Sequence, residues 1–400
     1  MRAALVTIVI CLFLGGCVSQ SVNSTSVPSV RTAGTQVSEA LLLDVGVTVF
    51  NPGIADYDVY EDEQIYPEVR RAESLFMAGQ LARAMAESAA WGAVRVVPDD
   101  THITDLKVHG EIRHSDGEQL ELHIVATDSR GAIWLDKTYR DSTSRYAYEM
   151  TTRNTFDPFQ KTYNDIANDL LHTLEQLTAA DREDVRLVTE LLFARSFSPD
   201  AFDGYLQRNP QGKYLVMRLP ANNDPMLERV RRIRERDHMY VDTLQQFYSD
   251  FDEQMEAPYD DWRKASYEQT VALREAKAES TRELVAGAIA IIAGMTAAIG
   301  GDQQATRAAG SLGVYSGGYL LKSGLAKRQA AQIHVSALEE LGTSLETEIA
   351  PQVIELEDRT ITLSGNVEEQ FDQWRDVLAE IYRAEVGDLE PLPAADVIAP

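Results

Sequence analysis

Cysteine is the residue that this chain has least of. Among its 400 residues only Cys11 and Cys17 are cysteines, and both stand within the first twenty positions. A disulfide framework is therefore excluded for everything that follows, and the folded part must be stabilised by packing. With 44% hydrophobic residues, the chain has ample material for such a core.

Positive charge is scarce as well. The chain has 37 Lys and Arg residues against 63 Asp and Glu residues, which gives a formal net charge of -26. A surface this acidic repels nucleic acid and anionic lipid headgroups, so we expect neither as an electrostatic partner.

Catalytic signatures are also missing from the sequence. It contains no Gly-rich phosphate loop ending in Gly-Lys-Ser/Thr, no G-x-S-x-G nucleophile elbow and no H-E-x-x-H zinc motif. We expect a protein that is not an enzyme and that needs no cofactor. Two carboxylates brought together by folding leave no mark in a sequence, so a hydrolase of cell-wall glycan stays open as an alternative.

Residues 1–16 have the layout of a secretory signal peptide. Arg2 provides a positive start, and residues 3–14 form an apolar run that is too short for a comfortable spanning helix. The ending "LGGC", Leu14 to Cys17, resembles the lipobox of bacterial lipoproteins. This resemblance implies cleavage before Cys17 and attachment of acyl chains such as palmitate to that cysteine. An ordinary signal peptide with an incidental cysteine is the alternative.

The residues after the cysteine indicate where such a lipoprotein would reside. Val18 follows Cys17, and by the sorting pattern of bacterial lipoproteins this favours the periplasmic face of the outer membrane. Residues 17–40 are rich in Ser, Thr and Val, which predicts a flexible tether between the lipid and the first folded domain. Attachment then rests on the acyl chains, which supply about 0.8 kcal/mol for each buried methylene group.

Residues 41–178 have the pattern of a small α/β domain. The run "LLLDVGVTVF" predicts a strand, and the helical pattern that begins at Pro67 ends at Gly92. A short strand at "AVRVVP" is followed by three strands over 105–115, 119–129 and 132–141, joined by hairpin turns. A helix near 156–177 completes the order strand, helix, strand, meander, helix.

This order of strands and helices, with its sequence motifs, resembles a group of envelope proteins. The resemblance is carried by "LLLDVGVTVFNPG", by a helix ending "AESAAWGAVRVVP" and by "DLKVHGEIRHSDGEQLELHIVATDSRGAIWLDKTYR". Together they are similar to the small α/β domain of the translocation protein TolB, the curli-secretion lipoprotein, flagellar outer-membrane lipoproteins and penicillin-binding-protein activator lipoproteins. The resemblance covers about a third of the chain and implies a role in binding or assembling proteins. The amphipathic hairpins of a secretion barrel are absent from the sequence, which argues against a curli-like channel.

Helices dominate the second half of the chain. Residues 179–223 are expected to connect two domains, as a helix broken at Ser198-Pro199 and a loop around a short strand at 214–219. A helical domain is expected over 224–386. Apolar residues recur at three- and four-residue steps from Met226 to Phe251, and a second helix is expected to begin near Tyr259.

The end of the chain adds a small strand pair and a final helix. The alternation in "VIELEDRTITLSG" predicts the strand pair, and the helix that follows has Asn366 as its N-cap. Residues 387–400 are expected to be disordered. The fold class is therefore α+β.

The most apolar stretch beyond the signal is the uncharged run 284–300. A spanning helix needs about 20 apolar residues, and this run consists largely of Ala and Gly. Glycines recur at intervals of seven on one face of two successive helices; they are Gly287, Gly294 and Gly301, then Gly310, Gly317 and Gly324. Since Gly costs a helix about 1 kcal/mol relative to Ala, close helix packing should compensate. We expect a hairpin over 284–326 that is buried in protein, with self-association or membrane insertion as alternatives.

Five arginines stand close together in the motif "ERVRRIRER". They are Arg229, Arg231, Arg232, Arg234 and Arg236. Guanidinium groups bind phosphate and carboxylate well, so this cluster could contact lipopolysaccharide phosphates or an acidic partner. The alternative is that these arginines pair with Glu228, Glu235 and neighbouring acidic helices.

Two other clusters invite a metal-site interpretation. The histidines His102, His109, His114 and His123 match no zinc spacing, and strands would place them on both faces of a sheet. The acidic loop Asp56–Glu63 lacks the spacing and the glycine of a calcium-binding loop. We therefore expect no metal.

These patterns favour one function and leave two alternatives. The favoured protein is an outer-membrane lipoprotein that binds or organises partners of an envelope machine, and it could form a homo-oligomer. A cell-wall hydrolase or a regulator of peptidoglycan synthesis is the first alternative. An oligomeric glycine-zipper protein that inserts into a membrane is the second.

Overall fold

The computed structural model describes residues 27–34, 38–54, 66–149, 156–221, 223–297, 338, 343, 351–355 and 360–386. Several predicted features lie outside these residues. They are the signal peptide, Cys17, the acidic loop Asp56–Glu63, the glycines Gly301, Gly310, Gly317 and Gly324, and the tail 387–400.

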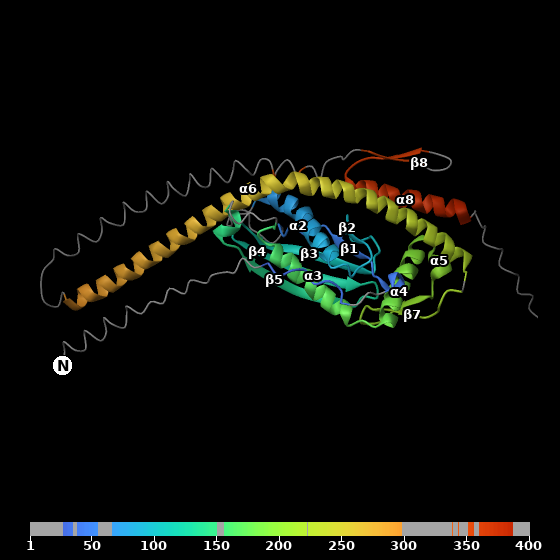
Figure 1. The fold of residues 1–400 in the computed structure, drawn as a ribbon, viewed down its shortest axis with the longest axis horizontal. Helices are drawn as coiled ribbons and strands as arrows, with labels where there is room; N and C mark the ends of the chain where they lie inside the picture. The colour runs from blue at the N-terminus through green and yellow to red at the C-terminus, as the bar shows by residue number, and fades with distance from the viewer. Residues whose placement is uncertain are drawn as a thin grey trace, which may run out of the picture.

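A mixed sheet of five strands forms the centre of the molecule (Figure 1). Strand β1 (Val45–Thr48) lies between β2 (Val94–Val97) and β3 (Leu106–Ser115) and is parallel to both. Strands β4 (Gln119–Asp128) and β5 (Ile133–Ser142) continue from β3 as the predicted antiparallel meander. Alternation along β3 and β4 directs one set of apolar side chains into the core and leaves the polar set on the opposite face.

Two helices cover the apolar face of this sheet. Helix α2 (Pro67–Glu87) begins with Pro67 in its first turn, where a missing N–H costs nothing, and α3 (Gln160–Glu175) packs beside it (Figure 1). The short 3-10 helices η1 (Glu39–Leu41) and η2 (Arg145–Tyr148) lie in the connections. Together with the helices of the second half, these elements confirm the predicted α+β class.

Residues 27–34 do not form a free tether. The amide of Asn164 donates to the carbonyl of Pro28 (2.8 Å), and the backbone N–H of Arg31 donates to the side chain of Asn168 (2.8 Å). Arg31 also pairs with Glu175 at 3.0 Å. The segment therefore lies along α3, because the Ser/Thr-rich composition that predicted a tether says nothing of docking partners more than 130 residues away.

The segment expected to connect two domains contributes to the same core as the sheet. Helix α4 (Ala179–Phe197) begins with a reciprocal capping box between Thr178 and Asp181 and buries Val185, Val188 and Leu191. Helix α5 (Pro199–Phe202) and the hairpin β6 (Leu206–Arg208) and β7 (Tyr214–Val216) follow. The domain boundaries expected near 178 and 224 stay predictions, and one hydrophobic cluster extends across both.

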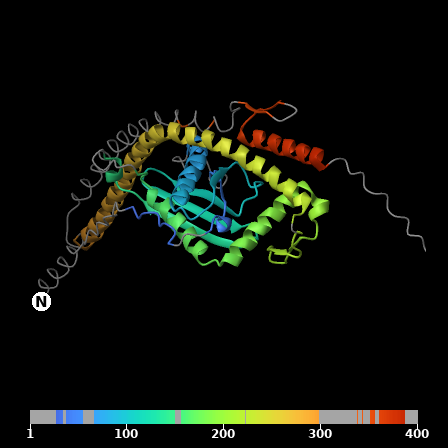
Figure 2. The ribbon, with the colours of Figure 1, turned by 45° about the vertical axis from the view of Figure 1, so that its right-hand side comes forward.

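Helix α6 (Pro225–Ala297) is a single element of 73 residues. The expectation of a separate helix beginning near Tyr259 is wrong, because α6 continues through Pro258. Proline within a helix costs about 3 kcal/mol, and burial of Met255, Tyr259 and Trp262 around Pro258 offsets that cost. Figure 2 shows α6 curving over the body of the molecule.

The strand pair, the final helix and its cap at Asn366, all predicted near the end of the chain, are confirmed. Strands β8 (Gln352–Glu355) and β9 (Thr360–Leu363) pair antiparallel, and α8 (Val367–Val386) lies along α6 (Figure 1). Asn366 accepts from the backbone of Glu369 (2.9 Å), and the Glu369 carboxylate accepts from the backbone of Asn366 (3.1 Å).

The predicted glycine-striped hairpin is described only in part. Gly287 and Gly294 lie in the last turns of α6. The rest of the predicted hairpin, residues 298–326, is outside the described residues. Among the residues that are described, no helix has the length and apolar run needed to cross a membrane.

Candidate functional site

The arginines of the "ERVRRIRER" motif connect α6 with its neighbours. Arg231 binds Glu190 of α4 (2.5 Å) and Glu228 (2.6 Å). Arg232 and Arg236 both bind Glu385 of α8, at 3.2 and 3.0 Å. These three guanidinium groups are thus neutralised by carboxylates of the chain itself.

The other two arginines of the motif have different surroundings. Arg229 lies 3.4 Å from the sulfur of Met226. The Nε of Arg234 is buried and has no hydrogen-bond partner in the described part of the chain. The structure does not assemble the five arginines into one anion site.

The four histidines are distributed over separate places, each beside a carboxylate. His102 lies 3.6 Å from Asp237; the pairs His109–Asp100, His114–Asp116 and His123–Asp136 are at 3.1, 3.0 and 2.9 Å. Only His102 is fully buried, where it packs against Phe371. Within the described ranges, no three metal-ligating side chains come together.

A buried charged cluster fixes α6 against α2 and β3. The carboxylate of Glu73 accepts from the hydroxyls of Ser115 (2.6 Å) and Tyr259 (2.7 Å). Burial raises the pKa of Glu73, and the nearby Arg70 opposes that rise. Arg263 lies over the ring of Tyr259 and binds Asp157 at 2.7 Å. Since the whole cluster is buried, its contribution is to the packing of α6.

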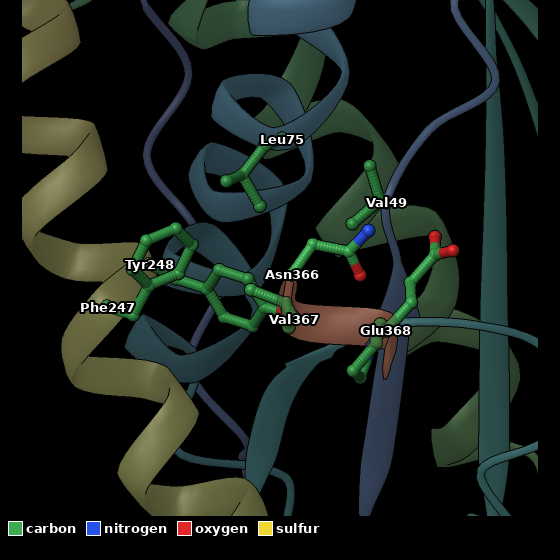
Figure 3. A pocket seen from close by; sticks show the side chains of 8 residues that line it. Val49, Leu75, Phe247, Tyr248, Asn366, Val367 and Glu368 are labelled. Carbon is green, nitrogen blue, oxygen red and sulfur yellow. The ribbon is translucent and has the colours of Figure 1, made fainter. Parts of the chain in front are cut away.

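A pocket of about 160 Å³ lies where β1 and β2 end beneath α6 and α8 (Figure 3). In open α/β sheets, ligands bind in crevices at such strand ends. Its walls are mainly apolar and come from α2, α6 and α8 and from residues next to β1, β2 and α8. The lining residues are Val49, Leu75, Pro98, Phe247, Tyr248, Asn366, Val367 and Glu368.

The polar groups of this pocket do not form an acid–base pair. Among the described residues Glu368 is the one carboxylate in the lining, and burial, with Asp99 and Asp372 nearby, raises its pKa. The buried hydroxyl of Tyr248 has no hydrogen-bond partner among the described residues. Glycoside hydrolysis uses two facing carboxylates, and this lining supplies one. The pocket therefore suits a single apolar group of about the size of an aromatic ring.

The hairpin β6–β7 and the residues just after it carry exposed apolar side chains. Tyr214 and Val216 pack toward the core, so Leu215 between them points outward and is 50% exposed. Met217 and Leu219 follow the end of β7 and are 57% and 69% exposed. The hairpin is fixed to the body, since the N–H of Tyr214 donates to the carbonyl of Arg130 (2.8 Å). Large apolar side chains that gather on a surface are typical of interaction sites.

The charge of this hairpin differs from that of the rest of the chain. Residues 206–221 contain Arg208, Lys213 and Arg218 and no Asp or Glu, within a chain of net charge -26. All three cations are exposed, and none pairs with a carboxylate in the described part of the chain. Arg218 instead lies over the ring of Tyr205, 4.0 Å from its centroid. We call Leu215, Met217 and Leu219, with these three cations, the β7 surface.

Sequence reasoning identified the short strand at 214–219 and missed the surface on it. Two signals were present: the two-residue step of Leu215, Met217 and Leu219, and the run of 206–221 without an acidic residue. Which side of the strand is buried depends on contacts with α4 and with the β4–β5 turn, and these have no local pattern.

Comparison of the chain with protein-family models, with curated proteins and with solved structures gives no match. The function must therefore be argued from the surfaces that the chain itself presents.

Proposed function

We propose that the chain is a lipoprotein of the outer membrane, facing the periplasm, that binds protein partners of an envelope machine through the β7 surface. The observation that carries this proposal is the exposure of Leu215, Met217 and Leu219 in a segment whose charged residues are all cationic. Lipidation of Cys17 and the outer-membrane location rest on the sequence of the amino terminus.

The chemistry of the β7 surface indicates what it would bind. Full burial of a Leu or Met side chain contributes about 1.5–3 kcal/mol, and roughly half of each of these three side chains is still available for burial. Arg208, Lys213 and Arg218 would attract carboxylates, and complementary charge raises association rates. The expected partner therefore presents an apolar segment flanked by acidic residues.

The finer architecture is part of the same proposal. Strands β1 to β5 with α2 and α3 would form the envelope-type α/β domain to which the sequence has a resemblance. Helices α6 and α8 would form the helical part, ending in the glycine-striped hairpin. The β7 surface belongs to the connection between them, so a partner could contact both parts, and a homo-oligomer could repeat the arrangement.

The test places a photo-crosslinking amino acid at Leu215 in cells that make the lipidated protein. We expect a defined cross-linked protein at this position, and loss of the product when Lys213→Glu and Arg218→Glu are added. Met239 on α6 is a matched control, because it is 57% exposed, against 50% for Leu215, but stands outside the β7 surface. Equal products at Leu215 and Met239, or none at Leu215, would contradict binding through this surface.

Membrane attachment is measured separately. Radioactive palmitate should label the wild-type protein and should not label Cys17→Ser. Labelling of both proteins, or of neither, would remove the lipid anchor from the proposal without affecting the cross-linking result.

A further inference from the structure

Helix α6 contacts the body of the molecule over its first fifty residues. The contacts follow in order along the helix: Arg231 with Glu190, Asp242 with Arg95, Asp252 with Arg83, Arg263 with Asp157, and Arg274 with Glu118. The pair Arg274–Glu118 is the last of these ion pairs. Up to this residue, the path of α6 is set by the α/β body.

Beyond Arg274 the helix continues for 23 residues to Ala297. At 1.5 Å per residue this segment is about 35 Å long. Figures 1 and 2 both show it as the orange stretch of α6 that extends away from the sheet and its helices. Its last fourteen residues, 284–297, contain no charged side chain, and they begin about 15 Å past Arg274.

The described amino-terminal segment, residues 27–34, begins at the same end of the body. At one end of this segment, the N–H of Ala33 donates to the carbonyl of Ser88, just after α2. At the other end, the carbonyl of Pro28 accepts from the side chain of Asn164, near the start of α3. Just before α3, Asp157 binds Arg263 of α6 at 2.7 Å. Pro28 therefore lies at the end of the body where α6 also leaves it.

The distance from the body that Cys17 can reach matches the distance that the end of α6 reaches. Cys17 stands ten positions before Val27, and ten extended residues span at most about 35 Å. A bilayer that holds acyl chains on Cys17 must lie within this distance of the body. The uncharged end of α6 occupies the range of about 15 to 35 Å from the body in which that bilayer would be found.

We propose that residues 284–297 of α6 insert into the surface of the same bilayer that holds the acylated Cys17. This inference rests on the lipid anchor of the proposed function. The partner is the apolar boundary of a lipid layer, since the segment has no cation to attract anionic headgroups and the chain as a whole is strongly acidic. Helix α6 would then act as a strut, and the body would be held at two points with the β7 surface directed to the periplasm.

The test uses the scarcity of thiols. Once the signal is removed and Cys17 is acylated, Ile292→Cys supplies a single free thiol for an environment-sensitive fluorophore. The matched control is Ser249→Cys, which lies on an exposed position of α6 within the part that contacts the body. The full-length acylated protein is reconstituted on phosphatidylcholine vesicles, with and without nitroxide-labelled lipid.

We expect blue-shifted emission from the label at position 292, and loss of that emission with nitroxide lipid, while the label at 249 responds to neither. Adding Ile291→Lys should abolish the response at 292. A label at 292 that stays insensitive on vesicle-bound protein would overturn the proposal. A blue shift that appears without vesicles and grows with protein concentration would assign the segment to a second copy and would overturn it as well.

The anchor and the strut can fail independently. If mass spectrometry shows no acylation, the anchor is wrong, and labelled Cys17→Ser protein mixed with the same vesicles still reports on insertion of α6. A response at 292 in that protein supports the strut alone, and no response rejects it.

Discussion

At the scale of single residues, Gly117 in the turn between β3 and β4 sets how closely α6 can approach the sheet. A Cβ at this position would overlap the carbonyl oxygen of Arg263 and the backbone nitrogen of Tyr267. The N–H of Gly117 also donates to the hydroxyl of Ser266 (3.3 Å), and its carbonyl accepts from Tyr148 (2.7 Å). The turn and the helix backbone are thus in direct contact.

The substitution Gly117→Ala should destabilise the protein by about 1–3 kcal/mol, the usual cost of overpacking a close contact. Gly34→Ala is the matched control, because no atom lies within 4 Å of a Cβ built there; it should remain within about 0.5 kcal/mol of the wild type. Urea unfolding of the three proteins measures both values. Equal stabilities of the two variants would show that α6 does not pack against this turn.

His102 and Asp237 form a buried pair whose two members respond to pH in opposite directions. Burial, with His238 and Lys107 nearby, lowers the pKa of His102 to about 3. Burial raises the pKa of Asp237 to about 6, against the opposing effect of Arg375 and Arg234. Both side chains line the small cleft between α4, α6 and α8.

The signs follow from which state binds more protons. Between pH 3 and 6.5 the unfolded chain protonates His102 and the folded chain does not, so this residue makes stability fall as pH falls. Between pH 3.8 and 6 the folded chain keeps a proton on Asp237 that the unfolded chain has lost, so this residue makes stability fall as pH rises. From about pH 4 to about pH 6 the two effects cancel.

Removing either residue should leave the pH dependence of the unfolding free energy that the other residue causes. His102→Gln should make the free energy of unfolding fall, relative to wild type, by on the order of 1 kcal/mol per pH unit as pH rises from about 4 to about 6. Asp237→Asn should make the free energy of unfolding rise, relative to wild type, by a similar amount per pH unit over the same range. Urea unfolding across this range tests both, and two variants that run parallel to the wild type would refute the buried pair.

At the scale of elements, α6 closes the exposed edge of the sheet. Strand β2 is an edge strand, and the side chain of Gln245 pairs with it: its oxygen accepts from the N–H of Val96 (2.9 Å) and its amide donates to the carbonyl of Val96 (2.9 Å). An edge strand with free backbone groups invites pairing with other chains. One glutamine therefore performs the function of a neighbouring strand.

Gln245→Ala should cost about 1–3 kcal/mol, since it leaves two backbone groups of a buried residue without partners. The adjacent Gln246→Ala is the control, because Gln246 is exposed and its side chain donates to Asp250 of the same helix. Urea unfolding gives the stabilities, and amide exchange at Val96 should accelerate only in Gln245→Ala. Unchanged exchange at Val96 would exclude this role for Gln245.

The elements differ in how far the sequence predicts them. The meander and α2 have local causes, namely alternation with turn residues and a helix start at Pro67, and the cap of α8 at Asn366 was equally visible. The continuity of α6 through Pro258 was not predicted, because local preference argues for a break and distant packing overrides it. Gln245 and the β7 surface were missed for the same reason: their roles depend on contacts with residues far away in the chain.

At the scale of the whole molecule, one hydrophobic cluster joins the sheet with α4, α6 and α8. The four tryptophans report on its two sides: Trp91 and Trp134 lie beside each other at the sheet, and Trp262 and Trp374 lie in α6 and α8. A shared core predicts that damage on one side lowers the stability reported by the other, whereas two independent domains would not transmit it.

The protein with Trp91→Phe and Trp134→Phe keeps its fluorescence in α6 and α8, and Leu122→Ala then removes a fully buried side chain from β4. Loss of a buried Leu side chain costs about 2–5 kcal/mol, so the urea midpoint reported by Trp262 and Trp374 should fall accordingly. Val125→Thr, on the opposite face of β4, should leave that midpoint nearly unchanged. If Leu122→Ala leaves the urea midpoint reported by Trp262 and Trp374 unchanged, the helical part folds independently of the sheet. Because α6 forms most of its described contacts with α2, β2 and α4, we expect the transition to be shared.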